Sequence, residues 1–143
     1  MSIKSILFVS VFLFIFLSGR AQPASEEIKG RYVEAIVFYY PWQVDTRIAT
    51  TAKDVRKQQA KKTILDSAEI DVLLKRWIMP SKLRPVVKLL PLKDVRLVID
   101  LFDREHKRTT YVANRFDLSI EDGAMMRQID ERFRDYFSSM FNK

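Results

Sequence analysis

Few residues in this sequence have the type and spacing that enzyme chemistry requires. There is one histidine, His106, and there is no cysteine, so thiol catalysis, cysteine-based zinc sites and iron–sulfur clusters are excluded. A histidine-based metal site needs more than one imidazole, and no acidic stretch has the spacing of a calcium-binding loop. The three glycines are widely separated, which excludes a glycine-rich phosphate loop. We therefore expect no metal and no cofactor.

The remaining catalytic candidates are His106 and the carboxylates of Glu34 and Asp100. A general base needs a fixed geometry, whereas His106 lies in a run of charged residues, which is typical of an exposed turn. Two carboxylates that flank a cleft can hydrolyse a glycosidic bond, but the sequence does not fix the separation of Glu34 and Asp100. Each is more simply a surface residue or a partner of Arg96 or Arg115. We predict that the protein is not an enzyme.

Aromatic and charged residues make a stronger case for binding than for catalysis. The run 39–42 is Tyr-Tyr-Pro-Trp, and such rings offer a large apolar area with a polar group at one end. The segment 103–108 is entirely charged or titratable, and rigid strands can present such a loop to a partner. An alternative is that alternate members of 39–42 lie in the core and that the tryptophan covers its rim. The predicted contact residues are Tyr40, Trp42, Arg104, His106 and Lys107.

The basic residues indicate which partners the protein prefers. The formal net charge is +7, with clusters at 53–62 and 75–88. Aromatic residues are not interleaved with these clusters, as single-stranded nucleic acids require, and export would remove most nucleic acid from reach. An acidic protein, an anionic cell-wall polymer or anionic lipid fits the charge better, although a solvated face without a partner is the simplest interpretation. We expect no nucleic acid as partner.

A hairpin and a helix are predicted to organise the second half of the chain. Residues 94–102 alternate apolar residues on one face with mixed residues on the other, and 109–116 are rich in types that suit a pleated sheet. A helix is predicted over 120–141, because Ser119 offers a capping hydroxyl and apolar residues then recur at three- and four-residue spacing. This amphipathic helix should bury its stripe against the hairpin.

The first half of the chain is predicted to begin with a central strand over 31–42, since residues 35–40 are apolar on both faces. Pro41 should end this strand, because proline cannot donate to a ladder. The segment 52–65 has two interpretations. One is a helix; the other, which we favour, is a short turn at 52–56 followed by an edge strand whose lysines discourage pairing with another chain.

A second helix is predicted over 66–79, with Asp66 as its cap and Pro80 as its stop. Residues 81–93 should form an irregular basic connection. The predicted fold is therefore α+β, with a small antiparallel sheet of three or four strands and the helices 66–79 and 120–141 packed on it. The residues expected in the core are Met126, Ile129, Phe133, Phe137, Ile70, Leu73, Trp77, Leu97 and Ile99.

The segment 1–21 has the layout of a secretory signal. A lysine precedes an apolar run over residues 6–17, and Gly19 and Ala21 then place small residues before the predicted cleavage site. The run is shorter than the roughly 20 residues that cross a bilayer, so we predict cleavage after Ala21, with an uncleaved membrane anchor as the alternative. Residues 22–30 are expected to be a flexible lead-in to a single domain over 31–143, in a secreted or periplasmic protein.

These features predict an exported protein that acts by binding another protein or an anionic envelope polymer, as an inhibitor, an immunity-type protein or an envelope accessory factor. Two alternatives remain open. One is a small cell-envelope hydrolase that uses carboxylates such as Asp100. The other is a structural protein held at the membrane surface by an uncleaved amino-terminal segment.

Export makes a direct prediction for the mature chain. Intact-mass analysis of the protein recovered from its host should find a chain that begins at or near Gln22, because signal peptidases cut after small residues. Recovery of a cytosolic protein that retains Met1 would contradict export.

Overall fold

The computed structural model describes residues 30–58, 60–64, 66–79, 83–85, 92–121 and 125–142. The predicted export segment and the lead-in as far as residue 29 lie outside the described residues. Among the helices described, none is long and apolar enough to cross a membrane.

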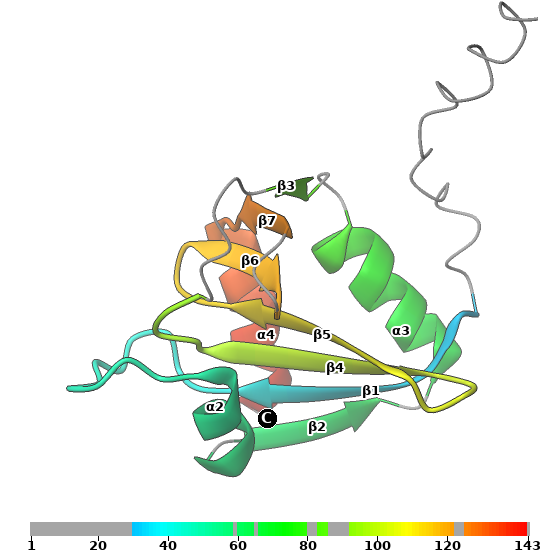
Figure 1. Ribbon diagram of the computed structural model, residues 1–143, viewed down its shortest axis with the longest axis horizontal. Helices are drawn as coiled ribbons and strands as arrows, with labels where there is room; N and C mark the ends of the chain where they lie inside the picture. Colours follow the sequence, from blue (N-terminus) through cyan, green and yellow to red (C-terminus); the bar gives the residue numbers. More distant parts are fainter. Residues whose placement is uncertain are drawn as a thin grey trace, which may run out of the picture.

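One antiparallel sheet forms the body of the described structure (Figure 1). Its seven strands follow the order β2-β1-β4-β5-β6-β7-β3, and every pair is antiparallel. The strands are β1 (Tyr32–Tyr39), β2 (Ala60–Ile64), β3 (Arg84–Pro85), β4 (Leu97–Asp103), β5 (Arg108–Ala113), β6 (Asp117–Ile120) and β7 (Met125–Gln128). The antiparallel α+β prediction is confirmed, but the predicted three or four strands were too few.

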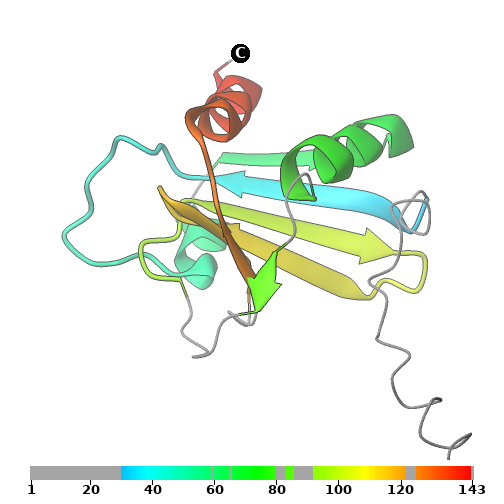
Figure 2. The same ribbon diagram turned by 90° about the horizontal axis from the view of Figure 1, so that it is seen from above.

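The helices cover the sheet on both faces. α3 (Ser67–Val72) continues directly into a π-helix, η2 (Leu73–Ile78), and lies with α4 (Glu131–Phe141) on one face. The shorter α2 (Ala52–Gln58) lies on the opposite face (Figure 2). Asp66 caps α3 as predicted, accepting a hydrogen bond from the Ala68 amide at 2.6 Å.

For the segment 52–65 the favoured interpretation is right about the edge strand, but a helix stands where a turn was predicted. The predicted turn at 52–56 is the short helix α2, and β2 then runs along the edge of the sheet beside β1. Two lysines of β2, Lys61 and Lys62, are at least partly exposed along this edge.

The larger core fills the space between the sheet and the pair α3–η2 and α4. Alternate strand residues such as Val37 and Ile99 meet Leu73 of η2 and Phe133 of α4. Of the nine residues expected in the core, seven are buried, whereas Trp77 and Met126 are partly exposed. A smaller core on the opposite face packs Val55 of α2 against Val98 of β4, Val112 of β5 and Val95, two residues before β4.

The prediction of a helix over 120–141 was wrong at its amino-terminal end. Residues 117–119 pair with 126–128 in the sheet, so the backbone there satisfies its hydrogen bonds across strands. The helix α4 begins only at Glu131, after Asp130 caps it by accepting the Phe133 amide at 2.9 Å. Apolar residues at 126 and 129 fit the helical stripe equally well, so spacing alone could not place the boundary.

The orientation of α4 can be tested by truncating its buried face. Phe133 is 1% exposed, and Phe133→Ala should lower the free energy of unfolding by about 3–5 kcal/mol through lost burial and a cavity. Phe116→Ala is the control, because Phe116 is 69% exposed and its loss should change little. If denaturant unfolding showed the same loss of free energy for both variants, the orientation of α4 described here would be wrong.

Candidate functional site

The predicted contact residues lie at two opposite ends of the sheet. In the β1–β4 ladder Tyr32 is opposite Asp103, and Tyr39 is opposite Leu97. The charged turn that follows Asp103 is therefore about 20 Å, or one strand length, from Tyr40 and Trp42. The structure does not bring these two groups together into one surface.

Trp42 belongs to the core rather than to an exposed surface. It is 5% exposed, and its indole N–H donates to the backbone carbonyl of Arg134 at 3.0 Å. Its ring meets Tyr39 edge-to-face with centroids 5.6 Å apart. The alternative interpretation is right that part of the run 39–42 lies in the core, but Trp42 is itself buried there and does not cover the rim.

The other predicted contact residues form an exposed turn. Arg104, His106 and Lys107 are all exposed. Backbone amides close the turn on Asp103: His106 N–H donates to its carbonyl at 3.0 Å, and Lys107 N–H donates to its carboxylate at 2.8 Å. His106 has a φ of 59°, and no side chain of the described residues holds its imidazole in a catalytic geometry.

Asp100 has a structural partner that the sequence did not predict. Arg56 of α2 donates two hydrogen bonds to its carboxylate, at 2.8 and 3.0 Å, and the Thr110 hydroxyl donates a third at 2.6 Å. Arg56 also reaches Glu121 at 3.0 Å. These hydrogen bonds, first of all those to Asp100, raise the pKa of the Arg56 guanidinium. Asp100 thus ties α2 to the sheet.

The two arginines that the sequence offered to Asp100 are engaged elsewhere. Arg96 is 1% exposed, donates to Asp94 at 2.8 Å and lies 4.8 Å from the Tyr40 ring centroid. Arg115 pairs with Asp45 at 2.6 Å. The predicted partnership was wrong because α2 folds back over β4, an arrangement that sequence spacing does not reveal.

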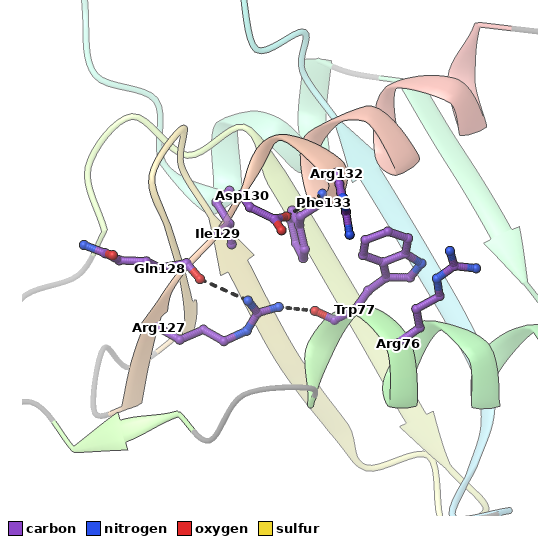
Figure 3. A pocket seen from close by; sticks show the side chains of 8 residues that line it. All are labelled: Arg76, Trp77, Arg127, Gln128, Ile129, Asp130, Arg132 and Phe133. Atoms are coloured by element: carbon purple, nitrogen blue, oxygen red, sulfur yellow. Dashed lines mark hydrogen bonds between the residues drawn. The ribbon is translucent and has the colours of Figure 1, made fainter.

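A hollow of about 520 Å³ lies between the end of η2 and the start of α4 (Figure 3). Its lining carries three guanidinium groups against a single carboxylate, that of Asp130. This carboxylate already accepts the Phe133 amide at the helix cap. We call this hollow the arginine–tryptophan pocket; it is lined by Arg76, Trp77, Arg127, Gln128, Ile129, Asp130, Arg132 and Phe133.

The π-helix presents two of the lining residues. The Met79 amide donates to the Leu74 carbonyl five residues back, at 2.8 Å, which is the π pattern. Such turns are uncommon and frequently occur at functional sites. Trp77 stacks on Tyr136 of α4 with centroids 4.6 Å apart, and the Arg76 guanidinium lies 5.1 Å from the Trp77 ring centroid.

Arg127 fixes the walls of the pocket relative to each other. Its guanidinium extends from β7 to donate to the backbone carbonyls of Trp77 and, at 3.0 Å, Gln128 (Figure 3). It also lies 5.4 Å from the centroid of the Phe133 ring. Burial lowers the pKa of Arg127, and the nearby Asp130 carboxylate acts in the opposite direction. Arg127 is therefore a tie between β7, η2 and α4.

Several polar groups of the pocket make no hydrogen bond among the described residues. Arg76 and Arg132 are exposed, and their side chains make no hydrogen bond within the described part of the chain. The indole nitrogen of Trp77 is buried and also has no acceptor there. A buried donor without an acceptor costs about 1–3 kcal/mol; the exposed guanidiniums of Arg76 and Arg132 are the groups of the pocket that are open to an anionic ligand.

The sequence patterns included residues of this pocket but did not predict that these residues lie together. Trp77 was assigned to the apolar stripe of helix 66–79, and Arg76 lies in the basic cluster 75–88. The adjacent arginine and tryptophan were the available signal. Arg76 and Trp77 meet segment 127–133 because residues 125–128 form the strand β7. A helix was predicted over 120–141 instead.

Comparison with known proteins adds no further constraint: no protein-family model, curated protein or solved structure matches this chain.

The tie between α2 and the sheet predicts a contrast between two ion pairs. Arg56→Leu leaves the buried Asp100 carboxylate without its charged partner; since the Arg56 side chain is 20% exposed, we expect a loss of about 2–3 kcal/mol, less than for a fully buried pair. Asp45→Asn breaks the exposed pair with Arg115 and should change stability little. Denaturant unfolding measures both, and a negligible effect of Arg56→Leu would contradict the structural role of Asp100.

Proposed function

We propose that this chain is an exported binding protein that engages an acidic protein partner at the arginine–tryptophan pocket. One observation carries the proposal: guanidinium groups from three segments, 76–77, 127–128 and 130–133, surround one hollow whose lining has a single carboxylate, that of Asp130. The excess of positive charge over the single Asp130 carboxylate favours an anionic ligand.

The composition of the pocket favours a protein as the partner over a linear polymer. Arginine, tryptophan and tyrosine dominate the hot spots of protein interfaces, and this pocket combines Arg76, Trp77 and Arg132 with Tyr136 stacked behind the indole. An anionic polymer is held by an extended positive groove that follows its backbone. A compact hollow suits one anchoring side chain of a protein.

The carboxylates support binding rather than hydrolysis. Two carboxyl groups have to flank a cleft for glycoside hydrolysis, and the pocket has only Asp130, which caps α4. The oxygens of Asp100 accept hydrogen bonds from Arg56 and Thr110. Export is the part of the proposal that rests on the sequence of residues 1–21 alone.

Two matched double variants test the proposal by affinity capture from envelope and culture extracts. Arg76→Gln with Arg132→Gln removes two positive charges at the pocket, and Arg104→Gln with Lys107→Gln removes two at the charged turn. All four side chains are exposed, so neither variant should destabilise the fold. We expect the pocket variant to lose about tenfold or more of a stoichiometric acidic partner, because charge-assisted hydrogen bonds are lost, and the turn variant to retain it.

Raised salt should weaken the wild-type capture, since exposed charges are screened. Loss of the partner from the turn variant alone would move the binding surface to residues 103–108. Recovery of no partner, with turnover of a cell-wall fragment by the protein instead, would contradict the proposed function.

A further inference from the structure

One end of the sheet carries exposed apolar side chains beside basic ones, and we propose that this end lies against an anionic phospholipid surface. We call it the loop end; it consists of residues 40–51, 92–96 and 114–116. The apolar side chains that enter the lipid are those of Val44, Ile48 and Phe116. The proposal goes beyond the proposed function, because it concerns a different surface from the arginine–tryptophan pocket and a lipid instead of a protein.

The first support is the exposure of apolar side chains at the loop end. Among the described residues, the two large apolar side chains with the highest exposed fractions both lie there: Ile48 is 82% exposed and Phe116 is 69% exposed. Val44 is a third exposed apolar residue, at 41%. Apolar side chains scattered singly over a surface are ordinary, whereas several of them at one place mark an interaction site.

The second support is that hydrogen bonds hold two of these apolar residues on neighbouring segments. Arg115, the residue before Phe116, donates to the Val44 carbonyl at 3.1 Å. The same guanidinium nitrogen donates to the Asp45 carboxylate at 2.6 Å. Figures 1 and 2 accordingly show the loop 40–51 and the turn between β5 and β6 at the same end of the sheet. Val44 and Phe116 can therefore meet one surface together.

The third apolar residue, Ile48, lies on an arch that is fixed on both sides. The Thr46 hydroxyl donates to the Asp94 carboxylate at 3.2 Å, and the Thr50 hydroxyl donates to the Val95 carbonyl at 2.6 Å. Figure 2 shows this loop projecting beyond the ends of the strands. The side chain of Ile48 can therefore enter a lipid surface while the strands keep their pairing.

The charges of the loop end fit an anionic surface. Asp45 and Asp94 each form an ion pair with an arginine, at 2.6 and 2.8 Å respectively. Arg47 and Lys93 are exposed and form no ion pair within the described part of the chain. Basic side chains beside exposed apolar ones are the combination that holds a peripheral protein on anionic lipid.

The arrangement of the apolar residues favours lipid over a protein partner. The main anchors of a protein interface cluster near its centre and fill well-packed pockets of the partner. At the loop end the anchors come from separate segments, the loop 40–51 and the turn between β5 and β6. A rigid partner would need a matching recess for each of them, whereas the fluid surface of a bilayer admits side chains that project separately.

The sequence contains no cysteine, so a single engineered cysteine can report how deeply the loop end lies in lipid. A nitroxide label is attached to the full chain at Ala49→Cys, or at Lys107→Cys at the opposite end of the sheet; both positions are exposed. The vesicles contain equal parts of phosphatidylglycerol and phosphatidylcholine, or phosphatidylcholine alone. Electron paramagnetic resonance then measures collisions of the label with oxygen, which concentrates in lipid, and with a water-soluble nickel complex.

On the anionic vesicles we expect the label at position 49 to be shielded from nickel and accessible to oxygen, and the label at position 107 to remain in water. Vesicles of phosphatidylcholine alone should shield position 49 less, because the attraction of the basic residues is lost. An amino-terminal segment that also bound lipid would bring both labels to the vesicle, but it would not by itself shield position 49 more than position 107.

Two double variants, made in the chain labelled at position 49, test the apolar and the basic residues separately. Ile48→Ser with Phe116→Ser should raise the lipid concentration needed for half of the shielding about tenfold or more, because two side chains no longer bury apolar surface. Arg47→Gln with Lys93→Gln should raise it by a similar factor on anionic vesicles. The matched control is Val33→Ser with Val72→Ser, which removes two exposed valines outside the loop end and should leave the shielding unchanged.

The proposal is overturned if nickel still reaches the label at position 49 on anionic vesicles, if both labels are shielded alike, or if the valine control loses as much shielding as Ile48→Ser with Phe116→Ser. The first outcome, together with capture of a protein that depends on Ile48 and Phe116, would assign the loop end to a protein partner instead. None of the substituted residues lines the arginine–tryptophan pocket, so each of these results leaves the proposed function to its own test.

Discussion

The burial of β4 on both faces is the constraint on which the rest of the structure depends. Every residue from Val95 to Leu101 is buried, although this run includes Arg96 and Asp100. A buried charge has to be paired or it destabilises the fold. α2 therefore lies where Arg56 donates to Asp100. Thr46 and Asp94 likewise lie where their side chains accept hydrogen bonds from Arg96. The need to pair these two charges therefore determines which segments pack on the face of the sheet that α2 covers.

The opposite face is organised by aromatic packing, and the candidate site lies where that packing ends. Trp77 joins η2 to α4 through ring contacts with Phe133 and Tyr136, at 6.3 and 4.6 Å between centroids. Beyond them, Arg127 extends from β7 and donates to the Trp77 backbone carbonyl near the end of η2. Arginines on three segments then surround the remaining hollow. The pocket thus lies where Arg127 of β7 meets the aromatic residues of η2 and α4.

Sequence patterns predicted the parts of this fold that local chemistry determines. The paired strands around residues 97–113 and the cap at Asp66 follow from alternation and from a carboxylate before a helix. What they did not predict are β3, β6 and β7, because four-residue or shorter strands carry too few residues for a periodic signal. The site was missed for the same reason: Arg127 and Arg132 were placed on one continuous helix, whereas they come from a strand and a helix. The Arg56–Asp100 pair is separated by 44 residues, and no local pattern encodes such a contact.

Photo-crosslinking in the native host tests most directly whether the pocket is the surface that meets a partner. A photoreactive residue replaces Gln128, an exposed lining residue, in one strain and Lys107 of the charged turn in another. Our account predicts a single crosslinked protein from position 128, joined through an acidic segment, and none from position 107. A crosslinked partner from position 107 and none from position 128 would contradict it.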